Sequence, residues 1–224
     1  MRYNSLLKGR NLQVALDLLD LDLAIRIARI AQQEGAAIIE AGTPLIKMYG
    51  MKAVRELREQ VKGTLILADL KTADVGELEV NMAADAGADI VTVLGCSDNS
   101  TVESAKNAAK SRGILLEADT INVKAPAARA SELIKLGADI VSFHVSIDQQ
   151  IREKIGADIL KKEIEAVNGK AIFSVAGGLN EKRIIRLNQL QVNIFVVGSA
   201  ITKSPNPQAA IQSIISAINA HDNI

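Results

Sequence analysis

The segment Asp69-Leu-Lys-Thr-Ala-Asp74 combines residue types that can stabilise negative charge or hold a metal ion. It closes the apolar run Leu65-Ile-Leu-Ala-Asp-Leu, which predicts a β-strand. Side chains two residues apart in a strand share a face, so Asp69 and Lys71 should point the same way, with Asp74 following in the turn. Two carboxylates around one ammonium suit a negatively charged intermediate or a metal. A surface salt-bridge cluster is the alternative, because charged pairs are common.

Short apolar runs alternate with longer amphipathic segments along the whole chain. We predict eight strands, at Leu12–Leu18, Ala37–Gly42, Leu65–Lys71, Ile90–Gly95, Ile114–Asp119, Ile140–Val145, Ala171–Gly177 and Ile194–Gly198. The segments Leu23–Ala31, Val102–Arg112 and Ile211–Ala220 have helical periodicity, and Pro126 and Pro207 lie near expected helix starts. Strand and helix in repeated alternation indicate a parallel sheet.

A weak internal repeat supports this organisation. Glu34-Gly-Ala-Ala-Ile-Ile, Ala86-Gly-Ala-Asp-Ile-Val and Leu136-Gly-Ala-Asp-Ile-Val each combine a helix end, a glycine stop and a new strand. Eight such units without a linker predict one α/β domain, a (β/α)8 TIM barrel over residues 11–224 after an N-terminal extension over residues 1–10. A doubly wound open sheet is the alternative, but no Gly-x-Gly-x-x-Gly follows the first strand.

Composition limits the partners and the compartment. The 224 residues carry a formal net charge of zero, which argues against bulk attraction to nucleic acid or to an anionic membrane. One cysteine, Cys96, excludes an intrachain disulfide and fits a reducing compartment; we expect it to be a small, partly buried residue rather than a nucleophile. Without a secretory signal or a transmembrane segment in the sequence, we expect a cytoplasmic protein.

Polar residues and glycines gather at the carboxyl ends of the predicted strands, where barrel enzymes place their function. In chain order these are Asp17, Glu40, Asp69 with Lys71 and Asp74, Asp119, His144, Gly177-Gly178 and Gly198-Ser199. The last two strand ends are rich in glycine, which lets a backbone approach a ligand closely. Because barrels bind phosphate after strands seven and eight, we predict a substrate that bears a phosphate.

Two further assignments follow from residue chemistry. Glu40 and Asp69 end neighbouring strands and suit Mg²⁺, which takes one or two protein carboxylates; alternatively one of them pairs with Lys71 and no metal binds. His144 has a side chain that can exchange protons near neutral pH. A hydrogen-bonded structural role for it is equally compatible with the sequence. The other histidine, His221, is expected to lie in a frayed tail.

These residues resemble the orotidine 5′-phosphate decarboxylase suprafamily, most closely its 3-hexulose-6-phosphate synthases, from about Leu12 to about Thr202. The matching segments are Leu12–Asp17, Ile39–Pro44, Ala68–Asp74, Ala88–Gly95, Asp119–Val123, Phe143–Gln150, Val175–Gly178 and Val197–Thr202. The related 3-keto-L-gulonate-6-phosphate decarboxylases typically have arginine where Ile147 stands, which favours the synthase branch. Many relatives also have arginine where Ser199 stands, a departure that bears on phosphate binding.

The resemblance implies an aldol reaction through an enediolate, joining formaldehyde to D-ribulose 5-phosphate to give D-arabino-3-hexulose 6-phosphate, or the reverse cleavage. It implies that Glu40 and Asp69 bind Mg²⁺, with Mn²⁺ as an alternative, and that the Lys71 ammonium is a second cation, kept charged and aimed by Asp74. It also implies that His144 is the general base or acid and that Asp17 orients Lys71 or a substrate hydroxyl. The residues implied to bind the phosphate are Gly177, Gly178, Gly198 and Ser199. In relatives Asp74 can come from the other subunit, so a homodimer is expected.

Two other functions are alternatives that the same residues allow. One is 3-keto-L-gulonate-6-phosphate decarboxylase, which uses the same enediolate chemistry. The other is a non-catalytic barrel that binds a sugar phosphate, although such a module has no need for Glu40, Asp69, Lys71, Asp74 and His144 together.

Overall fold

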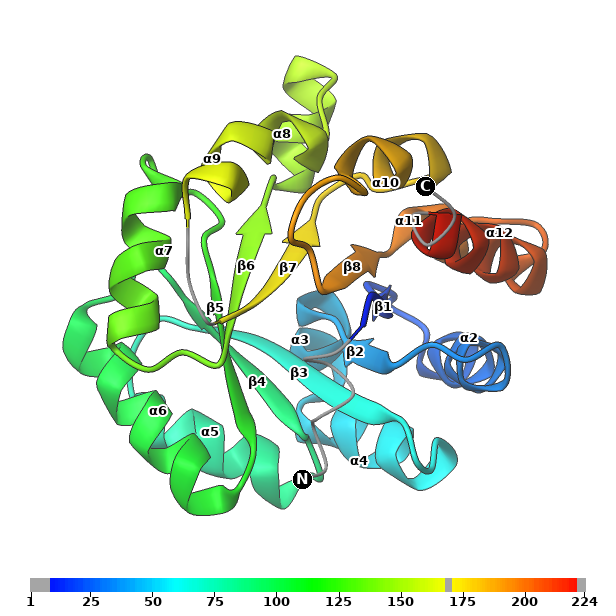
Figure 1. Ribbon diagram of the computed structural model, residues 1–224. Helices are drawn as coiled ribbons and strands as arrows, with labels where there is room; N and C mark the ends of the chain where they lie inside the picture. The colour runs from blue at the N-terminus through cyan, green and yellow to red at the C-terminus, as the bar shows by residue number, and fades with distance from the viewer. Residues whose placement is uncertain (1–8, 168–170, 221–224) are drawn as a thin grey trace.

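The computed structural model describes residues 9–167 and 171–220, and within them eight parallel strands close into a barrel in chain order (Figure 1). The strands are β1 Asn11–Leu16, β2 Ile38–Ala41, β3 Leu65–Thr72, β4 Ile90–Leu94, β5 Leu115–Asp119, β6 Ile140–His144, β7 Ile172–Ala176 and β8 Ile194–Val197. Every predicted strand is present, and the (β/α)8 barrel is confirmed as one domain. The predicted extension over residues 1–10, mostly outside the described residues, stays a prediction, and the expectation for His221 also lies outside them.

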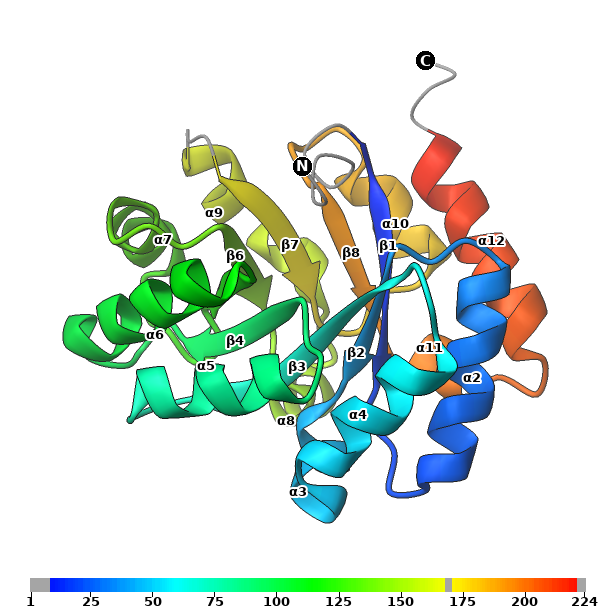
Figure 2. The same cartoon turned by 90° about the horizontal axis from the view of Figure 1, so that it is seen from below.

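Helices form a ring around the strands (Figure 1). They are α2 Leu21–Gln33, α3 Thr43–Tyr49, α4 Met51–Gln60, α5 Gly76–Asp85, α6 Asn99–Arg112, α7 Pro126–Lys135, α8 Ile147–Glu153, η1 Ala157–Leu160, α9 Lys161–Ala166, α10 Glu181–Leu187, α11 Ser199–Thr202 and α12 Pro207–Asn219. In the side view the strands run toward the end of the barrel where α3 and α8 lie (Figure 2).

Local sequence determines where these helices begin and end. Pro126 and Pro207 are the first residues of α7 and α12, as predicted, where a missing N–H costs nothing. The three repeat glycines, Gly35, Gly87 and Gly137, have φ angles of +90°, +95° and +93°. This left-handed conformation ends a helix and favours glycine, so the repeat marks the turn into each following strand.

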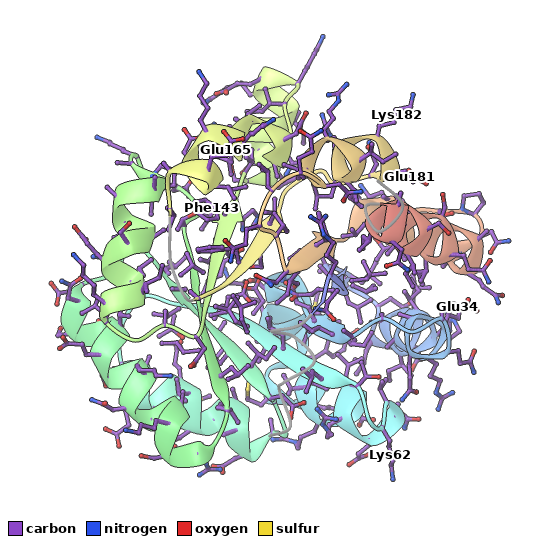
Figure 3. The ribbon with its side chains drawn as sticks, viewed as in Figure 1. Glu34, Lys62, Phe143, Glu165, Glu181 and Lys182 are labelled. Atoms are coloured by element: carbon purple, nitrogen blue, oxygen red, sulfur yellow. The ribbon has the colours of Figure 1, made fainter. Side chains whose placement is uncertain are left out.

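The outer core fills the space between the strands and the helices with aliphatic side chains. Val14, Ile39 and Val91 pack from the strands against helix residues such as Ile27, and all four are buried. Two of the few aromatic residues, Phe143 and Phe173, also lie there, with ring centroids 5.9 Å apart (Phe143 is labelled in Figure 3). Dense aliphatic packing on both faces of the sheet is what a parallel barrel requires.

A polar seam joins the first and last helices of the ring. Glu34, at the end of α2, accepts hydrogen bonds from Gln208 Nε2 at 2.6 Å and Gln212 Nε2 at 2.8 Å on α12. Figure 3 places Glu34 at the outer surface of the barrel, away from the strands. On the neighbouring side, Glu181 of α10 accepts a bond from Ser213 at 2.9 Å. The charged groups here therefore close the ring and take no part in a site inside the barrel.

Inside the barrel, alternate positions of alternate strands form layers of four side chains. From the amino ends of the strands upward, the register gives Ile38, Ile90, Ile140 and Ile194; then Gln13, Leu67, Glu117 and Ser174; then Glu40, Thr92, Ser142 and Val196; then Ala15, Asp69, Asp119 and Ala176. All sixteen are buried. The isoleucine layer is apolar, and each of the three layers above it carries two or three polar side chains.

Cys96 departs from the prediction. It is exposed rather than partly buried, because it lies in the loop between β4 and α6, beyond the last strand residue, Leu94. Within the described residues, no helix is long and apolar enough to cross a membrane.

Candidate active site

A cavity of about 1170 Å³ opens at the carboxyl ends of the strands. Its lining includes nine of the ten predicted site residues: Asp17, Glu40, Asp69, Lys71, His144, Gly177, Gly178, Gly198 and Ser199. These residues come from β2, β3, β6 and the segments just after β1, β7 and β8, so only closure of the barrel brings them together. The carboxyl end of the barrel is also where barrels of this kind carry their chemistry.

Lys71 and Asp69 form the ion pair expected from their spacing in β3. Lys71 Nζ lies 2.7 Å from Asp69 Oδ2, and Thr92 Oγ1 donates a 2.8 Å hydrogen bond to Asp69 Oδ1. The β3–β4 register shifts between Ala68 and Thr72, and Lys71 has a φ of +50°, unusual for a residue with a side chain. Such irregularities re-aim side chains near functional sites. Thr92 Oγ1 stabilises this one by accepting a 2.9 Å bond from Lys71 N.

His144 is oriented by Asp119, a residue that the sequence placed at a strand end without a role. His144 Nδ1 lies 2.8 Å from Asp119 Oδ2, and Ile121 N donates a 2.8 Å bond to Asp119 Oδ1. Asp119 Oδ2 is also 3.4 Å from Lys71 Nζ. One buried carboxylate thus bridges the two candidate cationic groups of the site, and Nε2 of the imidazole remains to meet a ligand.

The charges of His144, Asp119 and Lys71 stabilise one another. Burial alone lowers the pKa of His144, but the charge of Asp119 and their hydrogen bond outweigh it, and the pKa is raised. Burial likewise raises the pKa of Asp119, but His144 and then Lys71 outweigh it, so the pKa is lowered. For Lys71, burial opposes the charge while Asp69 and Asp119 raise the pKa well above its usual range. Lys71 is therefore a permanent cation.

Negative charge is nevertheless in excess at this end of the barrel. Burial raises the pKa of Glu40 well above its ordinary value, with further contributions from Asp69 and Asp17. Part of Asp17 is exposed at the mouth of the cavity, but its carboxyl group lies among protein atoms, and burial followed by the charge of Asp69 raises its pKa as well. A site that holds several carboxylates near one lysine would gain stability from a further cation.

Glu40 and Asp69 fit a hard divalent cation. Both are buried acids on adjacent strands, Glu40 Oε2 accepts a 2.7 Å bond from Gln13 Nε2, and Asp69 Oδ2 is 2.7 Å from Thr43 Oγ1. Within the described part of the chain, no three His, Cys, Asp or Glu side chains are grouped to hold a metal ion by themselves. A metal here would need water and substrate oxygens in addition to two carboxylates, which is the coordination Mg²⁺ accepts.

At the ends of β7 and β8, glycines place main chain without side chains at the wall of the cavity. Gly177 and Gly178 have φ angles of +117° and +63°, and a Cβ on Gly177 would lie 2.5 Å from Val145 O. Gly198 faces Asp17, since a Cβ added to it would lie 3.7 Å from Asp17 Oδ2. Side chains at these positions would fill the cavity wall, so glycine keeps the space in which a small anion could meet backbone groups.

Asp74 is the one predicted site residue that the structure does not bring to the cavity. It lies on the exposed turn before α5, and its Oδ1 accepts a 2.7 Å bond from Val75 N. In the described part of the chain, Lys71 pairs with Asp69 and Asp119 instead. The expectation that Asp74 holds Lys71 is therefore not met within one chain, because the turn after Thr72 carries Asp74 away from the barrel axis.

Several contributors to the site were missed by reasoning from strand ends alone. They are Gln13, Thr43, Thr92, Glu117 and Ser174. Most occupy inward positions below the strand ends, where a strict alternation of polar and apolar residues is the available signal. The run Glu117-Ala-Asp119 shows it clearly, since two acids alternate with a buried alanine in an otherwise apolar strand.

Comparison with known families assigns nearly the whole chain to one group of barrels. Residues 10–214 match the family described as "Orotidine 5′-phosphate decarboxylase / HUMPS family". The match covers all eight strands and every residue that lines the candidate site.

Individual relatives agree with this assignment. A 3-hexulose-6-phosphate synthase from Mycobacterium gastri is 37% identical over 208 residues, which are 92% of this chain and 99% of that protein. A bifunctional enzyme Fae/Hps from Methanothrix thermoacetophila is 36% identical over 207 residues, 92% of this chain but 52% of that protein, so this chain spans about half of its length. A crystal structure of a 3-hexulose-6-phosphate synthase superposes with a TM-score of 0.89 at 36% identity, covering 93% of this chain and 99% of the other.

Proposed function

The chain belongs to the orotidine 5′-phosphate decarboxylase / HUMPS family, and from that premise we propose that it is an aldehyde-lyase that joins formaldehyde to D-ribulose 5-phosphate. The product is D-arabino-3-hexulose 6-phosphate, and the same site would catalyse the reverse cleavage. The observation that carries the proposal is the bridge at Asp119, which holds a permanently charged Lys71 and an oriented His144 in one cavity. A proton acceptor beside a fixed cation suits chemistry that creates a carbanion.

His144 is the group to which we assign the first proton transfer. With Nδ1 bonded to Asp119, the neutral imidazole presents the lone pair of Nε2 to the cavity. Nε2 takes one proton from C1 of ribulose 5-phosphate, and the electrons of that C–H bond form an enediolate over C1 and C2. The charge of Asp119 stabilises the imidazolium that results, for the same reason that it raises the pKa of His144 against burial.

Lys71 faces the negative charge that then develops. Its ammonium is held by Asp69 and Asp119, so it is aimed before the substrate arrives and needs little reorganisation. Glu40 and Asp69 would hold Mg²⁺, or Mn²⁺ in its place, and the metal when bound supplies a Lewis acid to substrate oxygens. Asp17, at the mouth of the cavity, would orient a substrate hydroxyl.

The carbon–carbon bond forms when C1 of the enediolate attacks the carbon of formaldehyde. The carbonyl oxygen of formaldehyde takes up a proton, the C2–O bond of the sugar returns to a carbonyl, and no redox change occurs. Protons are conserved if the His144 imidazolium returns the proton that it took. The isoleucine layer closes the cavity below, so bulk solvent enters it from the mouth.

The phosphate is assigned to the turns after β7 and β8. Gly177, Gly178, Gly198 and Ser199 line the cavity there, and Lys203 lies in the same wall, one helical turn after Ser199. Ser199 contributes a hydroxyl rather than the fork of an arginine. We assign the positive charge on this wall to Lys203, which is exposed and can move onto a phosphate.

A homodimer in the cytoplasm completes the proposal. Exposed apolar side chains flank Asp74, with 53% of Val75, 59% of Leu78 and 45% of Met82 accessible in the single chain. Such a patch is typical of a surface that another protein covers. A second copy docked there would bring Asp74 of one subunit toward the cavity of the other, and the single cysteine fits a reducing compartment.

The test is to identify the product. ¹³C-labelled formaldehyde and ribulose 5-phosphate are incubated with the protein and Mg²⁺, and ¹³C NMR should show the label in a new CH₂OH group bonded to the former C1. A parallel reaction supplies 3-keto-L-gulonate 6-phosphate and measures release of CO₂. Ile147 lines the cavity where decarboxylases of the resemblance have arginine, so we expect little release. Rapid decarboxylation without condensation would replace the proposal, and sugar-phosphate binding without either reaction would indicate a non-catalytic barrel.

A further inference from the structure

The layer just above the isoleucines contains three buried polar side chains that the proposed reaction does not use directly. It is formed by Gln13, Leu67, Glu117 and Ser174. In a barrel layer all four side chains point at the axis, and Gln13 on β1 lies opposite Glu117 on β5. Gln13 and Glu117 are 2% and 3% exposed, so their polar atoms are removed from bulk solvent and need partners within the barrel.

Each of these side chains has one partner on its own side of the barrel. Ser174 Oγ donates a 2.8 Å bond to Glu117 Oε1, and Gln13 Nε2 donates a 2.7 Å bond to Glu40 Oε2. The second oxygen of each group, Gln13 Oε1 and Glu117 Oε2, is buried without a hydrogen-bond partner in the described protein. Both atoms are acceptors, so they cannot satisfy each other while Glu117 is ionised, and both residues line the main cavity.

A water molecule has the two donors that such a pair requires. We propose that an ordered internal water is bound on the barrel axis between Gln13 Oε1 and Glu117 Oε2, and that Glu117 acts through it as a positioning residue for Gln13 and Glu40. Buried waters typically bridge otherwise unsatisfied polar groups of this kind. Burial raises the pKa of Glu117 to about 7, and a water can serve either protonation state by turning one hydrogen or one lone pair toward it.

The bridge has a consequence for Glu40, one layer above. The amide of Gln13 can point either its NH₂ group or its oxygen at the Glu40 carboxylate. A water that donates to Oε1 fixes that oxygen on the axis and leaves Nε2 toward Glu40 Oε2. Without the water the amide can turn over, and its oxygen would then repel the Glu40 carboxylate. This step rests on the proposed function, because it matters only where Glu40 holds the metal.

The water itself is tested by a high-resolution crystal structure of the wild-type protein without ligands. We expect density for one water within about 2.7–3.2 Å of both Gln13 Oε1 and Glu117 Oε2. A direct contact between the two side chains, or an axis filled by Leu67 with no density between them, would overturn the proposal. This result does not depend on metal binding or turnover, so it stands even if the proposed reaction is wrong.

The positioning role is tested with Mg²⁺ alone, by calorimetric titration of folded variants. Glu117→Leu removes the acceptor and should weaken the Mg²⁺ Kd about tenfold, whereas Glu117→Gln can still hold the water and should stay within about twofold. Leu67→Val, in the same layer but outside the polar chain, is the packing control and should match wild type.

A double-mutant cycle separates the route through Gln13 from a general disturbance of the barrel. If Glu117 acts through Gln13, Glu117→Leu should have no further effect on Mg²⁺ affinity in a Gln13→Leu background. Equal and additive losses would overturn the positioning role. A wild-type protein that binds no Mg²⁺ would instead refute the proposed metal site, and the crystallographic test of the water would remain.

Discussion

Replacing Asp119 by asparagine should separate catalysis from stability in this barrel. The carboxylate bonds His144 Nδ1 at 2.8 Å, Ile121 N at 2.8 Å and lies 3.4 Å from Lys71 Nζ. Asparagine has nearly the same shape and retains an oxygen for Ile121 N. It lacks the charge that holds the imidazole proton on Nδ1, so His144 loses both its orientation and its stabilised imidazolium. General acid–base groups contribute on the order of 10²–10⁴-fold, so we expect kcat to fall by about 10²–10³-fold.

Stability should change far less. Charge-assisted hydrogen bonds are worth about 1.5–3 kcal/mol each, but removing Asp119 also relieves the repulsion by which it raises the pKa of Glu117. Since Lys71 keeps Asp69 as a partner, we expect a net loss of about 1–2 kcal/mol. For a chain of this size 1 kcal/mol moves Tm by about 2–4 °C, so Tm should fall by less than about 8 °C.

The pH dependence of kcat/KM is the assay that identifies the cause. In the wild type Asp119 raises the pKa of His144 against the effect of burial. In Asp119→Asn the main contributions that raise the pKa are lost while burial and the charge of Lys71 still lower it, so the pKa falls and His144 is unprotonated at lower pH. The acidic limb of the profile should therefore move to lower pH. A lower kcat with an unmoved acidic limb would refute the role of Asp119 through His144. A further large loss of kcat when Asp119→Asn is added to His144→Gln would refute it too.

Three further outcomes follow from the structure. Burial raises the pKa of Glu117 to about 7, whereas an unfolded glutamate titrates near 4.3. Between these pH values the folded protein keeps a proton that the unfolded chain has released, so stability falls as pH rises. Glu117→Gln should therefore raise the free energy of unfolding by up to about 3 kcal/mol at pH 8 and by little at pH 4, measured by urea titration; an equal change at both pH values would contradict this. Ile140→Ala, in the buried isoleucine layer, should cost about 2–5 kcal/mol in the same assay, while Ile185→Ala at an exposed site should cost under about 0.5 kcal/mol. Lys203→Ala should raise KM for ribulose 5-phosphate about tenfold with kcat unchanged, and an unchanged KM would remove Lys203 from the phosphate site.

The barrel was predictable because strand and helix periodicities are strong local signals. Gly35, Gly87 and Gly137 recur where a helix ends and the chain turns back into the sheet. Their φ angles are positive, a conformation that the presence of glycine already indicates in the sequence. Strand ends were equally readable, since in a parallel barrel they all face the same way. Nine of the ten predicted site residues could therefore be placed in one cavity without any contact being known.

What the sequence did not predict depends on register and on side-chain direction. The pairing of Asp119 with both His144 and Lys71 requires strands that are distant in sequence to meet at one height in the barrel. That Gln13 and Glu117 lie opposite each other in one layer follows only from the register around the whole barrel. Spacing alone also cannot show that the turn after β3 leads Asp74 away from the cavity of its own chain, and its role across a dimer stays a prediction.

The most direct test of the account is formaldehyde consumption with ribulose 5-phosphate, with and without Mg²⁺, in the wild type and in Asp69→Ala. Asp69 holds Lys71 at 2.7 Å and is one of the two proposed metal ligands, so its loss removes a metal ligand and leaves Lys71 anchored by Asp119 alone. We expect consumption that depends on Mg²⁺ and disappears in Asp69→Ala. A folded, metal-loaded wild-type protein that consumes no formaldehyde, or an Asp69→Ala variant that consumes it at the wild-type rate, would contradict it.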